Sequence, residues 1–136
     1  MELNYWIHEN KIFFKPEFND KLDNYINIIS EYTELIFSDY DDFNITIKTN
    51  NIYNIDYYNN HKGSIFNQPI TIPQNITHLI FGNCFNQQVI IPQNITHLTF
   101  GCDFNQPVII PQNVTYLTFG YRFNQKLNKL HFVELI

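Results

Sequence analysis

The side chains best able to do chemistry in this sequence are two histidines and two cysteines at nearly regular spacing. His78 and His97 are nineteen positions apart, and Cys84 and Cys102 are eighteen apart. Imidazole and thiolate groups are common zinc ligands, but zinc requires a complete tetrahedral set of them. Nineteen residues after His97 the chain has Tyr116, which interrupts the histidine series. We therefore expect two surface histidines rather than a metal site, and we expect no cofactor.

Carboxylates are the second group of side chains with chemical potential. Glu34, Asp41, Asp42 and Asp56 gather in the N-terminal half of the chain. A catalytic carboxylate needs further groups around it, and the sequence shows no nucleophile, phosphate-binding or metal-binding motif. We expect these carboxylates to be solvated loop residues and the protein not to be an enzyme. Catalysis on a β-solenoid is the alternative.

The histidines and cysteines lie within a sequence repeat of nineteen residues. Its first half begins with Phe-Asn-Gln, at residues 66–69, 85–88, 104–107 and, shortened, 123–125. Its second half runs from a proline to a glycine, at residues 73–82, 92–101 and 111–120. Identity at a fixed period means that each unit occupies the same structural slot, so the units are expected to stack. Residues 66–122 are therefore predicted to form three clear repeats.

Weaker copies extend the repeat toward the N-terminus. Residues 18–19 and 43–44, Phe-Asn in both cases, resemble the start of a unit at spacings of 25 and 23 residues. Residues 32–37 and 52–57 resemble the second half of a unit. All 136 residues are then one domain. We interpret its parts as an N-terminal cap at 1–17, degenerate repeats at 18–65, the three clear repeats, and a truncated repeat with a C-terminal cap at 123–136.

The apolar pattern of each unit predicts short parallel strands. Leu98 and Phe100 are two positions apart and turn inward, while His97 and Thr99 face outward. One unit has too few apolar side chains to offset the entropy lost by ordering its backbone, so neighbouring units must share their burial. The expected fold is mainly β, with strands and turns: a short solenoid of about six coils with parallel strands.

A polar turn residue recurs at one corner of each unit. Asn67, Asn86, Asn105 and Asn124 follow the phenylalanine that opens each copy. In stacked units these side chains would lie above one another, where they could hydrogen-bond to the turn backbone and to each other. We predict a structural asparagine ladder.

The recurrent Phe-Asn, Ile-Pro and Thr-His-Leu-x-Phe-Gly sequences resemble the FNIP repeat family of social amoebae and of giant viruses of amoebae. The resemblance is specific over residues 66–125, weaker over 18–65 and absent from the first 17 residues. It implies a leucine-rich-repeat-like solenoid, which in this family is often joined to an F-box that couples a target to a ubiquitin ligase. Residues 1–16 lack a helical F-box pattern. The resemblance therefore implies target recognition without an F-box, by a viral protein acting on an amoebal host.

The outward positions of the expected strands vary between copies, whereas the inward positions do not. One outward position carries Glu34, Asn54, His78, His97 and Tyr116, and the position two residues later includes Thr99 and Thr118. Variation on a regular scaffold is typical of a protein-binding surface, with tyrosine and histidine supplying amphipathic contact area. We therefore predict that this face binds a protein partner. The alternatives are ordinary polar surface residues and a structural or self-associating protein.

Composition narrows the possible partners. The chain has a net charge of −5 and a single arginine, Arg122. Nucleic acids and anionic membranes attract basic surfaces, so neither is expected as a partner. No segment has the length of a membrane span or the continuous apolar core of a signal peptide. We expect an intracellular, cytoplasmic protein, in the host cytoplasm if it is viral, with Cys84 and Cys102 as free thiols, and a monomer rather than an oligomer.

Overall fold

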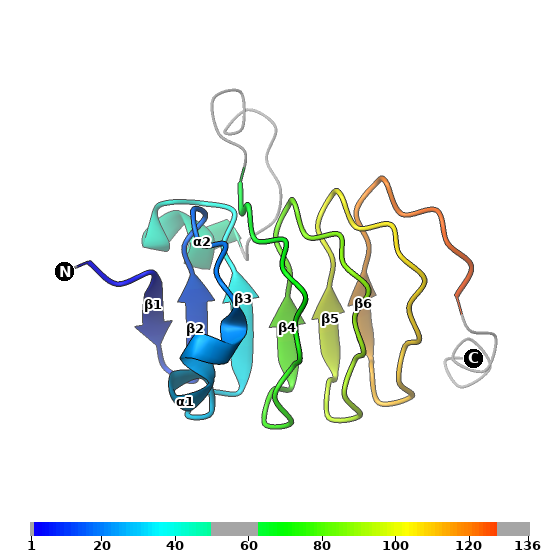
Figure 1. The fold of residues 1–136 in the computed structure, drawn as a ribbon, viewed down its shortest axis with the longest axis horizontal. Helices are drawn as coiled ribbons and strands as arrows, with labels where there is room; N and C mark the ends of the chain where they lie inside the picture. The colour runs from blue at the N-terminus through cyan, green and yellow to red at the C-terminus, as the bar shows by residue number, and fades with distance from the viewer. Residues whose placement is uncertain (1, 50–62, 128–136) are drawn as a thin grey trace.

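A single six-stranded sheet organises the protein. The computed structural model describes residues 2–49 and 63–127. The strands are β1 (Tyr5–His8), β2 (Lys11–Phe14), β3 (Glu34–Phe37), β4 (His78–Ile80), β5 (His97–Thr99) and β6 (Tyr116–Thr118). They lie side by side in chain order (Figure 1). The described residues also form a 3-10 helix η1 (Leu22–Tyr25) and two α-helices, α1 (Ile26–Ile29) and α2 (Phe43–Thr49).

Most of the sheet is parallel. β1 pairs with β2 in an antiparallel hairpin, and each later strand is parallel to the one before it. The register matches the sequence repeat, because Leu79 pairs with Leu98 and Leu98 pairs with Leu117. Leu35 continues the same row toward the N-terminus. The predicted strand-based, mainly parallel architecture and the predicted alignment of residues 32–37 with the later repeats are confirmed.

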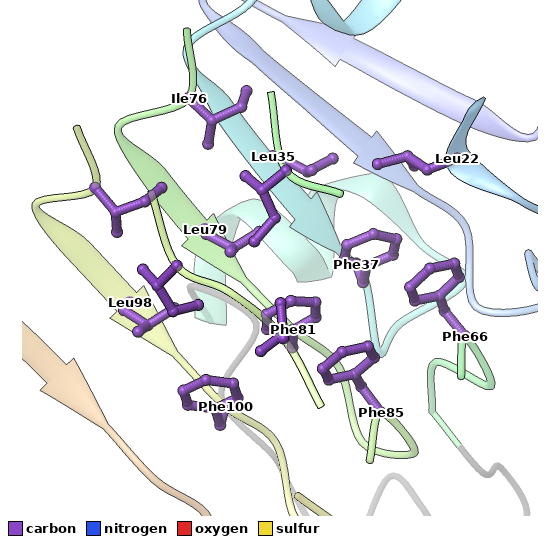
Figure 2. Close-up of a cluster of buried hydrophobic side chains, with 14 of the residues drawn as sticks. Leu22, Leu35, Phe37, Phe66, Ile76, Leu79, Phe81, Phe85, Leu98 and Phe100 are labelled. Atoms are coloured by element: carbon purple, nitrogen blue, oxygen red, sulfur yellow. The ribbon is translucent and has the colours of Figure 1, made fainter. Parts of the chain in front are cut away.

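Two rows of stacked phenylalanines form much of the core. The first row follows the strand ends, with ring centroids of Phe81 and Phe100 5.4 Å apart. The second row opens the following segments, with Phe85 and Phe104 6.1 Å apart. The rows also touch each other, since the Phe81 and Phe85 rings are 3.9 Å apart. Figure 2 shows the rings of Phe81, Phe85 and Phe100 beside the leucines of the strands, so each unit completes the core of its neighbour.

The segments that return from one strand to the next form a second layer over the sheet (Figure 1). They are extended, and alternate side chains turn inward: Val89 and Ile91 are buried, whereas Ile90 between them is 88% exposed. The leucines and isoleucines of both layers meet in one buried cluster. The alternation explains how a nineteen-residue unit covers the core on two sides.

Residues 43–44 do not open a repeat, contrary to the sequence prediction. Phe43 begins helix α2, because the Asp42 carboxylate accepts hydrogen bonds from the backbone N–H groups of Asn44 (2.9 Å) and Ile45 (3.2 Å). Such an acceptor satisfies N–H groups that the first helical turn leaves unpaired. Asp42, expected to be a solvated loop residue, is thus a helix cap.

In the degenerate half, the corner after β3 is much longer than the other corners. At each corner, the phenylalanine at the end of a strand stacks on the phenylalanine that opens the next segment. The two are four positions apart at Phe14 and Phe18 and at Phe81 and Phe85. After β3 they are Phe37 and Phe66, which are 66 − 37 = 29 positions apart. The corner after β3 is therefore longer by 29 − 4 = 25 residues and includes α2.

Five strands run in parallel, where about six coils were expected. β3 pairs directly with β4, so no strand stands between them. The strand expected at residues 52–57 lies outside the described residues. The fold is mainly β, as expected, and residues 22–29 and 43–49 add short helical segments to the strands and turns. Within the described ranges, no helix is long and apolar enough to cross a membrane.

Candidate binding face

The side of the sheet that faces away from the phenylalanine core carries two rows of side chains. The outer row is Lys11, Glu34, His78, His97 and Tyr116, in the register of the paired strands. The second row, two residues further along each strand, is Phe13, Ile36, Ile80, Thr99 and Thr118. We call these two rows the strand face.

Aromatic rings stack along the C-terminal half of the outer row. The imidazoles of His78 and His97 have centroids 4.1 Å apart and planes 12° apart. The ring of Tyr116 follows, 5.8 Å from that of His97 and tilted by 19°. Parallel strands hold equivalent side chains one strand spacing apart, so the repeat itself imposes this stacking.

The threonine before each histidine holds the imidazole ring in place. Thr77 Oγ1 lies 2.8 Å from His78 Nδ1, and Thr96 Oγ1 lies 2.9 Å from His97 Nδ1. Each threonine hydroxyl also lies 3.3 Å from a carbonyl oxygen of the preceding unit. With Nδ1 engaged in this way, Nε2 is the ring nitrogen that each histidine can offer to a partner.

The surroundings of His78 favour its neutral form. Partial burial lowers the pKa of His78 below 6.5, and the nearby His97 and Lys11 lower it further, against the opposing effect of Glu34. His78 is therefore uncharged at neutral pH. The aromatic row presents flat rings with one polar edge each.

Charged residues occupy the other end of the outer row. Lys11 Nζ lies 3.8 Å from Glu34 Oε2, and the Glu34 side chain is only 16% exposed. Glu34 pairs directly with His78, and Asn54 lies outside the described residues. Glu34, a predicted partner residue, is thus mostly covered, with Lys11 as its ion-pair partner.

Helix α2 covers the N-terminal part of the strand face. The Phe43 ring packs against the rings of Trp6 and Phe13, with centroids 5.7 and 5.5 Å away. Phe13 and Ile36 are each 3% exposed as a result. A small second core therefore packs on this side of the sheet against β1 and β2.

A groove of about 850 Å³ runs along the strand face, from Lys11 and Glu34 at one end to Tyr116 and Thr118 at the other. His97, Thr99, Tyr116 and Thr118 line it on the strand side, and Ile47 of α2 borders it. Exposure increases toward the C-terminal strand, where Tyr116 is 56% exposed. The structure thus places the predicted residues Glu34, His97, Thr99, Tyr116 and Thr118 in one groove, with His78 stacked against His97.

Two features of this site were missed at the sequence level. Lys11 heads the outer row because residues 11–14 pair in register with residues 34–37, although residues 1–17 had been interpreted only as a cap. The sequence did contain a signal for this pairing, because residues 12–14 (Ile-Phe-Phe) and residues 35–37 (Leu-Ile-Phe) share one apolar pattern. The wall formed by α2 had no such signal, because no other unit contains this helix.

Asp39 lies buried at the corner beside the groove. Its Oδ1 accepts hydrogen bonds from the backbone N–H groups of Ser64 (2.8 Å) and Asn83 (2.7 Å). Burial raises its pKa to about 6, against the opposing effect of these two hydrogen bonds. This carboxyl joins the end of the long corner to the unit that follows it.

The remaining candidate ligands do not converge on one point. Cys84 and Cys102 are free thiols, and burial, together with the nearby Asp39 and Asp103 carboxylates, raises the pKa of Cys102. In residues 2–49 and 63–127, no three histidine, cysteine or acidic side chains are placed to hold one metal ion. Asp56 of the acidic group lies outside these ranges.

The corner asparagines form a continuous row of hydrogen bonds. Asn67 Oδ1 accepts from the Asn86 backbone N–H, Asn86 Oδ1 from that of Asn105, and Asn105 Oδ1 from that of Asn124, each at 2.9 Å. Asn19 heads the row in the same way. The glutamine after each asparagine donates from Nε2 to the asparagine of the preceding unit, as Gln87 does to Asn67. The row ties the corners of successive units together.

Comparison with known proteins places the repeat half of the chain in a family. The family model described as FNIP Repeat matches residues 66–103, 85–110 and 104–132. No curated protein and no solved structure matches the chain. The matched segments overlap in the nineteen-residue units whose strands, phenylalanine rows and asparagine row are described above. Residues 66–132 therefore belong to the FNIP repeat family, which makes this a repeat protein.

Proposed function

We propose that this chain is a non-catalytic protein-interaction module, a short leucine-rich-repeat-like solenoid whose strand face binds a protein partner. The observation that carries the proposal is the aromatic row of His78, His97 and Tyr116, stacked at 4.1 and 5.8 Å beside a groove. Rigid rings with a polar edge supply large contact area and few rotatable bonds, and aromatic residues are enriched at protein interfaces. The FNIP match supports a repeat scaffold of this kind.

The partner contacts chiefly the C-terminal half of the strand face. In the N-terminal half Phe13 and Ile36 are each 3% exposed and Lys11 engages Glu34, so these side chains offer less contact area. Tyr116 and Thr118 are exposed at the other end. Tyr116 is the expected centre of the interface, because large exposed aromatics contribute most to binding energy.

The chemistry of Asp39 supports a structural rather than a catalytic role. A raised carboxyl pKa beside a groove is often a sign of general acid or base catalysis. Here Asp39 Oδ1 is already bonded to two backbone N–H groups at 2.7 and 2.8 Å, which orients the carboxyl toward the corner. The raised pKa follows from burial at that corner.

Affinity capture with matched variants tests the proposal. The repeats of this chain resemble the FNIP repeats of social amoebae and of giant viruses of amoebae. A lysate of a social amoeba is therefore the appropriate source of partners. The test variant combines His78→Ala, His97→Ala and Tyr116→Ala. The control combines Gln74→Ala, Gln93→Ala and Gln112→Ala, three exposed side chains away from the strand face.

The native chain and the glutamine variant are expected to retain the same proteins, and the strand-face variant to lose them. Thermal unfolding of all three chains verifies that the fold persists. The proposal is wrong if the strand-face variant retains the full set, or if the native chain retains nothing above a blank resin.

A further inference from the structure

The repeat half of the chain is almost without charge. Of the 21 charged residues (8 + 13), only Asp103 lies between residues 63 and 121. Its carboxylate is 3.4 Å from Arg122 Nε, so even this charge has a partner. Protein surfaces normally intersperse charges of both signs, which keeps copies apart in solution. The surface of these repeats has no such protection.

A row of exposed apolar residues crosses this uncharged region on the side opposite the strand face. Ile90 and Ile109 are 88% and 72% exposed, at equivalent positions of two successive units. Thr71 occupies the same position one unit earlier, and it is exposed as well. We call the surface formed by Thr71, Ile90 and Ile109, with the exposed Pro69, Gln88 and Pro107, the return face.

The exposure of these isoleucines is not needed for folding. Their neighbours Val89, Ile91, Val108 and Ile110 are 3 to 9% exposed and fill the core, while Ile90 and Ile109 point away from it. Thr71 shows that a polar side chain fits the same position of the unit. Ile90 and Ile109 also border an open hollow of about 1070 Å³, and Lys126 is the one charged residue among its described lining residues.

We propose that two copies of this chain associate through their return faces. Each copy carries a net charge of −5, so repulsion between copies is weakest when they approach through an uncharged surface. The return face is such a region, and burying its isoleucines removes exposed apolar area from water. A twofold axis between Ile90 and Ile109 brings Ile90 of each copy against Ile109 of the other, which makes the contact self-complementary.

This arrangement differs from the monomer that the sequence favours. In the pair, the two strand faces point outward on opposite sides. A dimer would therefore present two binding faces and gain avidity for a partner that itself carries repeated sites.

Sedimentation velocity across protein concentrations of about 1 to 300 µM tests the inference. The native chain is expected to convert from monomer to dimer within this range. Ile90→Thr combined with Ile109→Thr, which copies the residue of the preceding unit, is expected to raise the dissociation constant at least about tenfold. Tyr116→Thr on the strand face serves as the matched control and is expected to dimerise like the native chain.

Salt provides a second readout. Added NaCl screens the repulsion between copies, so dimerisation is expected to hold or to strengthen from about 50 to 500 mM. The inference is overturned if the native chain stays monomeric throughout, if the double threonine variant dimerises like the native chain, or if Tyr116→Thr alone abolishes the dimer. Oligomers that grow without limit would also overturn it, because a twofold contact closes after two copies. Urea unfolding of each variant shows whether the fold is retained.

Discussion

At the scale of single residues, two polar side chains at the corners show how the repeat is held together. The corner asparagines accept backbone hydrogen bonds from the next unit, and Asp39 performs a similar task at the long corner. Both act because backbone N–H groups at a turn need acceptors once they are removed from water. The protonation of Asp39 and the removal of a corner asparagine each have a measurable effect on stability.

Asp39 makes stability depend on pH. Its pKa is about 6 in the folded protein and 3.8 in its unperturbed state, so the folded chain holds a proton between these values that the unfolded chain releases. The stability contributed by this group is full below about pH 4 and is lost as the pH rises to about 6. The rise of the Asp39 pKa from 3.8 to about 6 corresponds to a total effect on the free energy of unfolding of about 3 kcal/mol.

The Asp39→Asn variant tests this assignment. It removes the titrating group and keeps an oxygen acceptor, so the free energy of unfolding is expected to vary less between pH 4 and pH 6.5 than in the native chain. Urea unfolding at intervals of half a pH unit measures the difference. Equal pH profiles for the two chains would show that Asp39 does not titrate in this range.

Asn86→Ala is expected to destabilise the protein by about 1 to 2 kcal/mol, because it leaves the Asn105 backbone N–H without its acceptor. Gln106 also loses the side-chain acceptor of its Nε2 group. Urea unfolding beside an exposed control, Gln93→Ala, measures the cost. A loss below about 0.3 kcal/mol, the size of an ordinary surface substitution, would mean that the asparagine row contributes little.

At the scale of elements, the insertion after β3 decides which part of the strand face is accessible. The sheet presents the same alternation in every strand, but α2 lies only over β1 to β3 and rests on the Phe43 ring. Figure 1 shows α2 beside the N-terminal strands and away from β5 and β6. The strand face of a regular sheet is thus most exposed at its C-terminal end, where Tyr116 lies.

Phe43→Ala is expected to loosen α2 from the sheet and to cost about 1 to 3 kcal/mol, less than deletion of a fully buried phenylalanine. Trp6, the one tryptophan of the chain, lies 5.7 Å from the Phe43 ring and reports the change through a red shift of its fluorescence. Ile47→Ala on the same helix, where Ile47 is 38% exposed, is the control. Unchanged emission from Phe43→Ala would mean that α2 stays in place without this ring.

At the scale of the whole molecule, stability comes from contacts between neighbouring units. Each phenylalanine row and the leucine row continue from one unit to the next, with ring spacings of 5.3 to 5.7 Å along the strand-end row from Phe37 to Phe119. Proteins built this way behave as a series of units with nearest-neighbour interfaces. One unit is therefore removable if the period is respected.

Deletion of residues 85–103, one complete unit, is expected to leave a folded chain in which β4 pairs with β6. The junction joins Cys84 to Phe104 and preserves the four-residue corner that begins at Phe81. Circular dichroism and urea unfolding should show a cooperative transition at a lower midpoint, because one interface is lost. Deletion of residues 85–94, half a unit, is the control and is expected to unfold the chain. Equal behaviour of the two deletions would contradict a periodic stack.

The repeat itself determined much of this fold before any coordinates. Identical residues at a fixed interval must occupy identical environments, so the pairing of Leu79 with Leu98 and Leu117, and the inward phenylalanines, were predictable from spacing alone. The alignment of residues 32–37 with the later strands was also predictable, because the apolar frame survives there. Periodicity, however, carries information only where the sequence repeats.

Only the tertiary structure decided what happens outside that period. Phe43-Asn44 copies the start of a unit, yet Asp42 caps a helix there and the side chain of Phe43 packs onto the opposite side of the sheet. The burial of Phe13 and one wall of the groove follow from where that helix lies, and the ion pair of Lys11 with Glu34 follows from the pairing of β2 with β3. These contacts join residues far apart in the chain, and their energies depend on packing geometry that local sequence patterns do not encode.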